Sequence, residues 1–333
     1  MPRYQARHDR DSFVLRDEHG AEVHIDPAHG NTVTRFSVAS DRGPLDLLVP
    51  ATTAGPNGYA AGVPILFPFP NRVAAGRYAF AGREHELERN ETGGRNHIHG
   101  FVRSRPWIVE ETGASATEGA WQRSAIRLDA FAEVRRQYPF PCSLTVTTRL
   151  RERVLVLEAT ARNTGTTPLP MGYGLHPWLF AAHVGSHRSE TQLRVPATAS
   201  WEALDRLPTG RRIALDGLRG PDARLDLRTW RPLADAGYDD VLTGVVRRPD
   251  GWTEAAVRYP GRGLQIDVTA SPSFREWAIF APIDRDAVCL EPYSGGTNAV
   301  NLETQAIDAG LVTLPPGATW SGTVRISARL RDT

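Results

Sequence analysis

Two side chains in this sequence have the types and settings that proton transfer requires. His176 lies between an aromatic-containing run and a proline within Met171–Trp178, and a histidine with its backbone held in this way suits general acid–base chemistry. Glu291 ends an otherwise apolar strand-like run. A carboxylate buried there either raises its pKa or finds partners, and both outcomes suit a general base near neutral pH. A core histidine and a solvent-facing glutamate remain open as alternatives.

A second polar group follows a proline-rich stretch. The three prolines between Gly62 and Asn71 fix φ and remove donors, so this backbone is neither an inner helix nor a central strand. We expect an ordered loop, of the kind that often carries function. Asn71 and Arg72 end it with amide groups and a planar cationic fork, and His97 and His99 come after a hairpin-like passage. Taken singly, each of these residues is equally consistent with an ordinary turn or surface.

Further carboxylates and aromatic side chains suggest a sugar ligand. Asp239 and Asp240 are adjacent in a glycine-led loop, although paired aspartates are usually turn residues. Trp178 and Trp277 lie beside the polar groups in sequence. An aromatic face can stack on the C–H face of a sugar while polar groups bind its hydroxyls. Most aromatic residues are core residues, so this pattern alone does not decide the ligand.

The composition excludes several kinds of chemistry. The chain has 333 residues, a net charge of +1 and no lysine, which excludes Schiff-base chemistry, lysine-bound pyridoxal phosphate and a Walker-type phosphate loop. It contains neither a G-x-S-x-G elbow nor a G-x-G-x-x-G loop. The near-zero net charge does not favour a nucleic-acid partner.

No metal or other cofactor is expected. Cys142 and Cys289 show no metal-type spacing. His97 and His99 have the H-x-H spacing of a β-barrel metal site, but no acidic residue follows them closely. A metal-dependent cupin-like enzyme therefore stays a minor alternative.

The N-terminal segment and the hydropathy of the chain predict a cytoplasmic protein. The N-terminal segment is polar and charged, which does not resemble a signal peptide. No apolar stretch approaches the roughly 20 residues that span a bilayer, so no membrane partner is expected. The oligomeric state is left open between a monomer and a homodimer.

Period-two patterns dominate the chain and predict an all-β fold. Cys142–Leu150 and Val154–Ala161 alternate apolar and polar residues, as do many shorter runs bounded by Gly, Pro, Asn and Asp. Ala125–Arg135 is also expected to be a strand. Short helices are expected only near residues 202–206 and 302–308, and residues 183–235 look like long excursions. We predict one large antiparallel β-sandwich that forms a single domain over residues 1–333.

Five motifs in order resemble the aldose 1-epimerase (galactose mutarotase) family. They span most of the chain, from about residue 62 to residue 302. The motifs are PILFPFPNR at 64–72, IHG at 98–100, YPFP at 138–141, Asn163 followed by GLHPW at 174–178, and LEPY at 290–293 followed by Asn298 and Asn301.

The resemblance implies a galactose mutarotase-like sandwich that interconverts the α and β anomers of a free hexose-type sugar without a cofactor. It implies that Glu291 takes the proton of the C1 hydroxyl and that His176 protonates the ring oxygen. His99, Arg72 and Asp239 would hold the sugar oxygens. Asn71 would shape the loop. The choice between Asp239 and Asp240 stays open.

Three departures from the family pattern affect the sugar preference. Phe101 stands where many members have a second glycine after His-Gly, and Trp178 stands where Tyr or Phe is common. Glu276 or Trp277 stands where many members have a glutamine. Two alternative functions remain. One is a hexose-6-phosphate 1-epimerase, for which the arginines in the first third of the chain are suggestive, and the other is a non-catalytic carbohydrate-binding protein.

Overall fold

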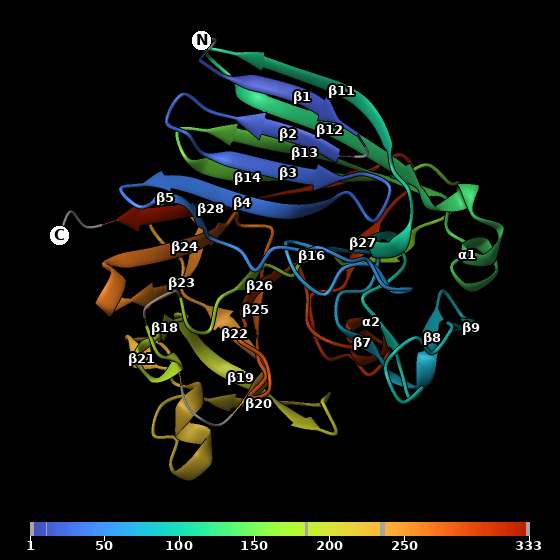
Figure 1. Ribbon diagram of the computed structural model, residues 1–333. Coiled ribbons are helices and arrows are strands. Elements are labelled where there is room, and N and C mark those ends of the chain that lie inside the picture. The colour runs from blue at the N-terminus through green and yellow to red at the C-terminus, as the bar shows by residue number, and fades with distance from the viewer. Residues whose placement is uncertain (1–2, 11, 184–185, 234–236, 331–333) are drawn as a thin grey trace.

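A computed structural model describes residues 3–10, 12–183, 186–233 and 237–330 of the protein (Figure 1). Within these ranges strands far outnumber helices. The strands are β1 (Gln5–Asp9), β2 (Ser12–Arg16), β3 (Glu22–Asp26), β4 (Thr32–Ser40), β5 (Gly43–Asp46), β6 (Ile65–Leu66), β7 (Arg72–Val73), β8 (Arg77–Phe80), β9 (Arg83–Glu86), β10 (His97–Ile98), β11 (Ile108–Ser115), β12 (Gly119–Arg127), β13 (Cys142–Arg151), β14 (Val154–Asn163), β15 (Leu169–Met171), β16 (Gly174–Leu175), β17 (Trp178–Leu179), β18 (Gln192–Arg194), β19 (Ala197–Leu204), β20 (Leu207–Ala214), β21 (Arg231–Pro232), β22 (Tyr238–Val245), β23 (Thr253–Tyr259), β24 (Leu264–Ala270), β25 (Glu276–Ala281), β26 (Val288–Tyr293), β27 (Val312–Leu314) and β28 (Thr319–Leu330). The helices are α1 (Ala132–Gln137) and α2 (Ala299–Glu303), with short 3-10 turns η1 (Ala74–Gly76), η2 (Val102–Ser104), η3 (Leu128–Ala130), η4 (Arg188–Glu190), η5 (Gly220–Leu225) and η6 (Pro260–Arg262).

Antiparallel pairing builds three main sheets. A nine-stranded sheet has the order β11-β12-β13-β14-β28-β24-β23-β18-β21, and an eight-stranded sheet has the order β20-β19-β22-β25-β26-β16-β6, with β17 also paired to β26. The five N-terminal strands form a third sheet, β1 to β5, which lies along β11 to β14 in Figure 1. The prediction of a large antiparallel all-β fold is confirmed.

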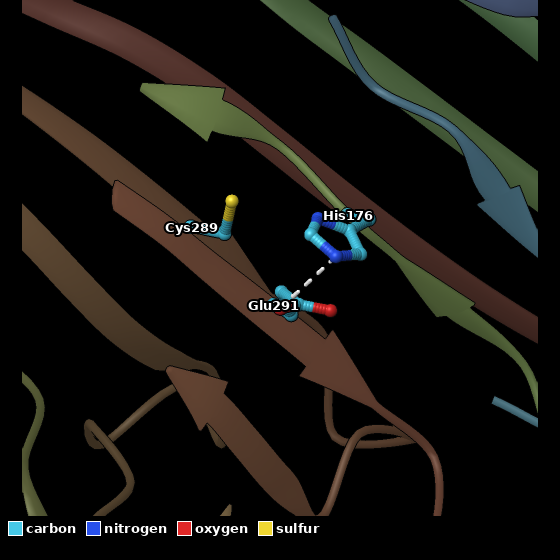
Figure 2. Close-up of side chains that lie close together, drawn as sticks. All are labelled: His176, Cys289 and Glu291. Carbon is cyan, nitrogen blue, oxygen red and sulfur yellow. Dashed lines mark ion pairs between the residues drawn. The ribbon is translucent and has the colours of Figure 1, made fainter. Parts of the chain in front are cut away.

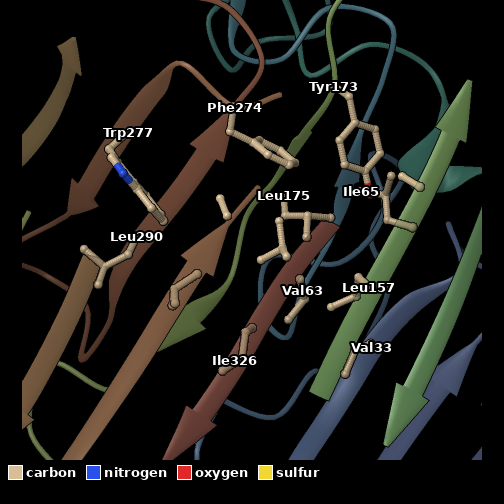
Figure 3. Close-up of a cluster of buried hydrophobic side chains, with 14 of the residues drawn as sticks. Val33, Val63, Ile65, Leu157, Tyr173, Leu175, Phe274, Trp277, Leu290 and Ile326 are labelled. Atoms are coloured by element: carbon tan, nitrogen blue, oxygen red, sulfur yellow. The ribbon is translucent and has the colours of Figure 1, made fainter. Parts of the chain in front are cut away.

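The apolar positions of the alternating strands form the core. Along β13 and β14 every second side chain is buried, as the period of a strand with one covered face requires. Leu157 of β14 and Ile326 of β28 belong to the same buried apolar cluster as Trp277 of β25 and Leu290 of β26 (Figure 3). The core therefore lies between the nine-stranded and eight-stranded sheets.

The opposite face of the eight-stranded sheet carries polar side chains. Ala278 pairs with Glu291 and Glu276 pairs with Tyr293 in the β25–β26 ladder. Because neighbours on a strand point to opposite faces, these four side chains turn away from the face that holds Trp277. This second face is where the candidate site lies.

Some local predictions were wrong. Residues 202–206 do not form a helix, since they end β19 and turn into β20 with positive φ at Asp205 and Arg206, the backbone of a tight hairpin turn. Ala125–Arg135 is not one strand, because β12 ends at Arg127 and α1 begins at Ala132. In the described part of residues 183–235, which were expected to be long excursions, β18 and β21 are members of the nine-stranded sheet, and β19 and β20 are members of the eight-stranded sheet. The helix expected near residues 302–308 is present as α2, which begins three residues earlier and ends at Glu303.

Candidate active site

Strand register brings His176 and Glu291 together. Gly174 of β16 pairs with Tyr293, and Trp178 of β17 pairs with Cys289. His176 is midway in sequence between Gly174 and Trp178, and Glu291 is midway between their partners Tyr293 and Cys289. The side chains of His176 and Glu291 therefore face each other. His176 Nε2 lies 3.4 Å from Glu291 Oε1 (Figure 2). Two residues from separate sequence motifs thus form one close pair.

Burial shifts both pKa values of this pair toward the neutral forms. Burial, together with the smaller effect of the Arg103 charge, lowers the pKa of His176 to about 3. Burial raises the pKa of Glu291 well above its ordinary value, and Asp239 adds to the shift. Between them the pair therefore holds one transferable proton, with the carboxyl protonated and the imidazole neutral.

Two groups oppose the shift of the Glu291 pKa. The hydroxyl of Tyr293 donates a hydrogen bond to Glu291 Oε2, and Arg72 supplies a positive charge, and both lower the pKa. Tyr293 is fully buried on the same face of β26. Oε2 is therefore fixed by Tyr293 while Oε1 faces His176, so each carboxyl oxygen has its own partner.

Aromatic rings hold the imidazole of His176. The indole of Trp178 stacks on it with the ring centroids 5.0 Å apart and an interplanar angle of 8°, and Phe280 lies edge-on. The backbone N–H of His176 donates to Pro64 O at 3.0 Å. Trp178 is 6% exposed, and its stacking on His176 places it at the site. The sugar-stacking role expected for it stays a prediction.

Asn71 and His99 fix each other across two segments. His99 N–H donates to Asn71 O at 2.9 Å, and Asn71 N–H donates to His99 Nδ1 at 3.2 Å. Since a backbone N–H can only donate, Nδ1 is the acceptor and Nε2 carries the proton. Gly100 allows this turn at φ +67°, where a Cβ would lie 2.0 Å from Phe67 O. His99 therefore offers an N–H donor, and its ring centroid is 5.4 Å from that of His176.

Arg72 is held between two carboxylates. Its Nε lies 2.6 Å from Glu91 Oε1, and its NH2 nitrogen lies 3.2 Å from Asp239 Oδ2. Burial disfavours the guanidinium charge, but Asp239 and Glu91 outweigh burial and raise the Arg72 pKa. Asn71 Oδ1 accepts a further hydrogen bond from the guanidinium at 3.2 Å. The fork is thus oriented before any ligand arrives.

Asp239 and Asp240 point to opposite sides of β22. Asp239 meets Arg72 and the exposed Arg206, whereas Asp240 forms a two-pronged ion pair with Arg224 at 2.6 and 3.1 Å. Of the two carboxylates left open by the sequence, Asp239 is the one on the side of the His176–Glu291 pair.

Trp277 does not belong to this group, which corrects the sequence-based expectation. It is fully buried in the core, and its indole N–H donates to Thr253 Oγ1 at 3.0 Å. Its neighbour Glu276 is on the face of Glu291 and accepts hydrogen bonds from Trp201 Nε1 and Thr243 Oγ1. Of the two candidates for the glutamine position, Glu276 has the matching orientation.

Sequence reasoning missed three residues of the site. Tyr293 could have been found, since it follows Glu291 at the i+2 position of a strand. Glu91 lies in an irregular segment between β9 and β10 without a pattern that signals it. Arg103 appeared only among several arginines, yet its charge acts on both His99 and His176.

One group of the described residues has the composition of a metal site. His176, Cys289 and Glu291 each offer a ligand atom, and these atoms lie within 4.8 Å of one another (Figure 2). Burial and the charge of Glu291 raise the Cys289 pKa well above its ordinary value. A metal would have to displace protons from both the thiol and the carboxyl, since the thiolate is the ligand form. The protonated donors therefore do not favour a cation.

His97 and His99 do not act as a ligand pair. His97 Nδ1 hydrogen-bonds to Glu88 O at 2.8 Å, and its ring packs on Phe101. His99 takes a positive φ of 65°, so the two side chains do not share the face that an H-x-H metal site requires.

Comparison with known proteins connects this site to a family. The sequence model of the family described as aldose 1-epimerase matches residues 11–327. Two uncharacterized Escherichia coli proteins are similar in sequence. YihR is 25% identical over 245 residues, covering 71% of each chain, and YphB is 25% identical over 281 residues, covering 81% of this chain and 84% of its own.

Solved structures share the fold at low sequence identity. A galactose mutarotase-like protein from Clostridium acetobutylicum superposes with a TM-score of 0.84 at 20% identity, covering 98% of both chains. A galactose 1-epimerase from Lactobacillus acidophilus superposes with a TM-score of 0.74 at 15% identity, again covering 98% of both chains.

Among the described residues, no helix combines the length and apolar character needed to cross a membrane.

Proposed function

The chain belongs to the aldose 1-epimerase family, and we propose that it interconverts the α and β anomers of a hexose-type sugar by general acid–base catalysis. The observation that carries this proposal is the 3.4 Å separation of His176 Nε2 and Glu291 Oε1. The anomeric hydroxyl oxygen and the ring oxygen of a pyranose are bonded to the same carbon. An acid and a base this close to each other can therefore reach both reacting oxygens of one sugar.

In ring opening, Glu291 takes the proton from the C1 hydroxyl while the C1–O5 bond breaks and C1 becomes a carbonyl carbon. His176 gives its proton to O5 in the same event, so protons and charge balance. Rotation about C1–C2 then presents the other face of the carbonyl. Closure reverses the two roles and regenerates the starting protonation, which is what a reaction with nearly equivalent forward and reverse directions requires.

The single proton of the pair has to move to His176 before ring opening begins. This proton lies on Glu291 at first, because burial disfavours the charges of both side chains. Transfer to His176 creates a carboxylate that the Tyr293 hydroxyl and Arg72 stabilise. Hydrogen bonds from sugar hydroxyls would add to that stabilisation.

The remaining polar groups are proposed to orient the sugar. His99 presents its Nε2–H, Arg72 presents its fork, and Asp239 offers carboxylate oxygens that accept from hydroxyls. Asn71 keeps both His99 and Arg72 in place. Trp178 supports the imidazole by stacking. Preorganised partners of this kind lower the cost of positioning the substrate.

A non-catalytic sugar-binding protein is less well supported. Binding alone gives no reason to bury a carboxyl and an imidazole in contact, because each buried ionisable group costs stability. The hexose-6-phosphate alternative relied on clustered arginines, and most of them carry an acidic partner within the protein. The described residues thus favour catalysis on a sugar without a bound phosphate.

Polarimetry on freshly dissolved α-sugars tests the proposal. The purified protein is expected to accelerate mutarotation of at least one hexose-type sugar above the spontaneous rate, and Glu291→Gln is expected to abolish most of that acceleration. Sugar binding by calorimetry without any acceleration across glucose, galactose, their 6-phosphates and their uronic acids would instead support a binding protein.

A further inference from the structure

Arg103 is built into the site by two glycines. It lies in η2, just after the segment that carries His99. A Cβ on Gly30 would lie 2.3 Å from the carbonyl oxygen of Arg103, and a Cβ on Gly58 would lie 2.1 Å from it and 3.4 Å from the Arg103 Cγ. Both glycines have positive φ. The backbone of Arg103 thus occupies a slot that only glycines leave open, which fixes where its side chain starts.

The guanidinium of Arg103 is not neutralised within the described part of the chain. Its side chain is half-buried and has neither an acidic partner nor a hydrogen-bond acceptor among the described residues. Burial lowers its pKa to about 10, and the only group that opposes this is Tyr293. Other arginines near the start of the chain have partners. These pairs are Arg72 with Glu91, Arg77 with Glu86, Arg95 with Asp205, and Arg105 with Glu133.

The charge of Arg103 is directed at the acid side of the catalytic pair. It lowers the pKa of His176 and His99, whereas the cation that acts on Glu291 is Arg72. The cations Arg72 and Arg206 are together offset by the carboxylates of Glu91 and Asp239, and the His176–Glu291 pair is neutral overall. Among the described residues, the site therefore carries one uncompensated positive charge, that of Arg103, whose turn η2 packs against β6 beside the strand β16 that leads to His176.

This charge has a defined position relative to the sugar. If His176 protonates the ring oxygen, then a group near His176 is also near C5, which is bonded to that oxygen, and near the C5 substituent. Resting on the proposed function, we propose that the substrate is an acidic hexose with one negative charge on its C5 substituent, which Arg103 binds through its guanidinium fork. A carboxylate or a sulfur oxyanion fits this description.

The single unpaired guanidinium of Arg103 favours a sugar with one negative charge over a sugar phosphate. A planar guanidinium matches a carboxylate or a similar oxyanion with two parallel hydrogen bonds. A phosphate monoester carries nearly two charges near neutral pH, and one arginine neutralises only half of that charge. A singly charged substituent balances Arg103, so the chemistry of the described residues favours it over a phosphate.

Matched sugar pairs test the proposal with the wild-type protein. Galactose and galacturonate, and glucose and glucuronate, differ only at C6, and glucose 6-sulfate and glucose 6-phosphate supply the other anions. We expect a higher kcat/KM for the uronates or the sulfate than for the neutral sugars and the phosphate. We also expect the KM of the preferred acid to rise with sodium chloride, because salt screens the attraction, while the KM of the neutral sugar stays unchanged.

Arg103→Gln identifies the responsible residue, with Arg77→Gln as the matched control that removes an exposed arginine from β8. The ratio of kcat/KM for acidic over neutral sugar should fall about 10- to 100-fold in Arg103→Gln, from the loss of a charged hydrogen bond, and should stay constant in Arg77→Gln. If Arg103→Gln does not fold, the wild-type ratio and its salt dependence decide the question.

Other outcomes overturn the inference in distinguishable ways. A preference for neutral sugars, or for glucose 6-phosphate, would refute the singly charged substrate and leave the proposed epimerase intact. Equal salt dependence for charged and neutral sugars would refute it as well. No acceleration of any sugar in the panel would refute the proposed function and this inference together.

Discussion

Tyr293 donates its hydroxyl hydrogen bond to the Oε2 atom of Glu291 from the same face of β26. The two residues are separated by Pro292, so the period of the strand alone sets them side by side. The other carboxyl oxygen, Oε1, faces His176. Tyr293 therefore fixes the plane of the carboxyl and stabilises its ionised form, which makes it a positioning residue for the proposed base.

Tyr293→Phe tests that role. The substitution keeps the ring and removes the only contact that the hydroxyl supplies to Glu291. Because the hydrogen bond lowers the Glu291 pKa, its loss raises that pKa further and makes the carboxylate less available. We expect kcat to fall about 10- to 100-fold, as for the loss of a hydrogen bond to a charged group. The alkaline limb of the kcat–pH profile should move to higher pH, because the pair then loses its proton at higher pH.

Tyr173→Phe is the matched control for this experiment. Tyr173 is equally buried, but its hydroxyl has no hydrogen-bond partner among the described residues, and its ring packs on Phe274 and Trp320. Its replacement should leave the pH profile in place. A lower kcat in Tyr293→Phe without any movement of the alkaline limb would show that the hydroxyl does not act through Glu291.

Glu291→Gln and His176→Asn should each reduce kcat by about 10²- to 10⁴-fold, the range for removal of a general acid or base, with sugar binding largely retained. The double variant should be no slower than the slower single variant, because the two side chains share one proton and act as a unit. Stopped-flow polarimetry on all three variants measures this. Losses that multiply in the double variant would mean that the two groups act independently.

The sequence predicted the residues of the site better than their orientation. Glu291 and His176 were identified from their setting and from the motifs that carry them. The two uncertain choices, Asp239 against Asp240 and Glu276 against Trp277, are the same physical question. Adjacent residues on a strand face opposite sides, and a shift of one residue in register exchanges them.

The pairing of β22 with β25 determines which of two adjacent residues faces the site. Asp239 pairs with Phe280 in the β22–β25 ladder, and Phe280 shares a face with Glu276. Local sequence does not contain this pairing, because the two strands are joined only after intervening β23 and β24. The same limit explains Arg103, which looks like an ordinary surface arginine until Gly30 and Gly58 are seen to enclose its backbone.

Neutralising the two aspartates separately tests the orientation of β22. Asp239→Asn weakens the hold on Arg72 and removes a proposed sugar ligand, so KM should rise about 10-fold, the loss expected for one charged hydrogen bond. Asp240→Asn breaks the ion pair with Arg224 on the other side of the strand. It should leave KM unchanged and lower the free energy of unfolding by about 1 kcal/mol or less. Equal effects on KM would contradict the assignment of Asp239.

Glu276 is a second buried carboxyl on the face of the site. Burial raises its pKa from 4.5 to about 8, although the hydrogen bonds from Thr243 and Trp201 and the charges of Arg275 and Arg212 oppose the shift. In the unfolded chain the same carboxyl titrates near 4.5. Between these two pH values the folded protein binds the proton that the unfolded chain has released.

The stability of the protein should therefore fall as the pH rises from about 4.5 to 8, by up to about 1.4 kcal/mol per pH unit from this group. The contribution of protonated Glu276 is complete below pH 4.5 and is lost as the pH passes through 8. Glu276→Gln keeps a neutral side chain that can accept from Trp201 and donate to Thr243, so it removes this slope. Other groups titrate in the same range, so the comparison with the variant isolates the part that belongs to Glu276.

Urea unfolding at pH 5, 6, 7 and 8 measures the effect as the difference in unfolding free energy between the variant and the wild type. That difference should grow with pH in favour of Glu276→Gln. Glu110→Gln, which removes an exposed carboxyl from β11, is the matched control and should give a constant difference. A constant difference for Glu276→Gln as well would mean that Glu276 is ionised in the folded protein throughout this range. Its contacts with Trp201 and Thr243 would then be those of a buried carboxylate, and the site would carry a negative charge beside Tyr293.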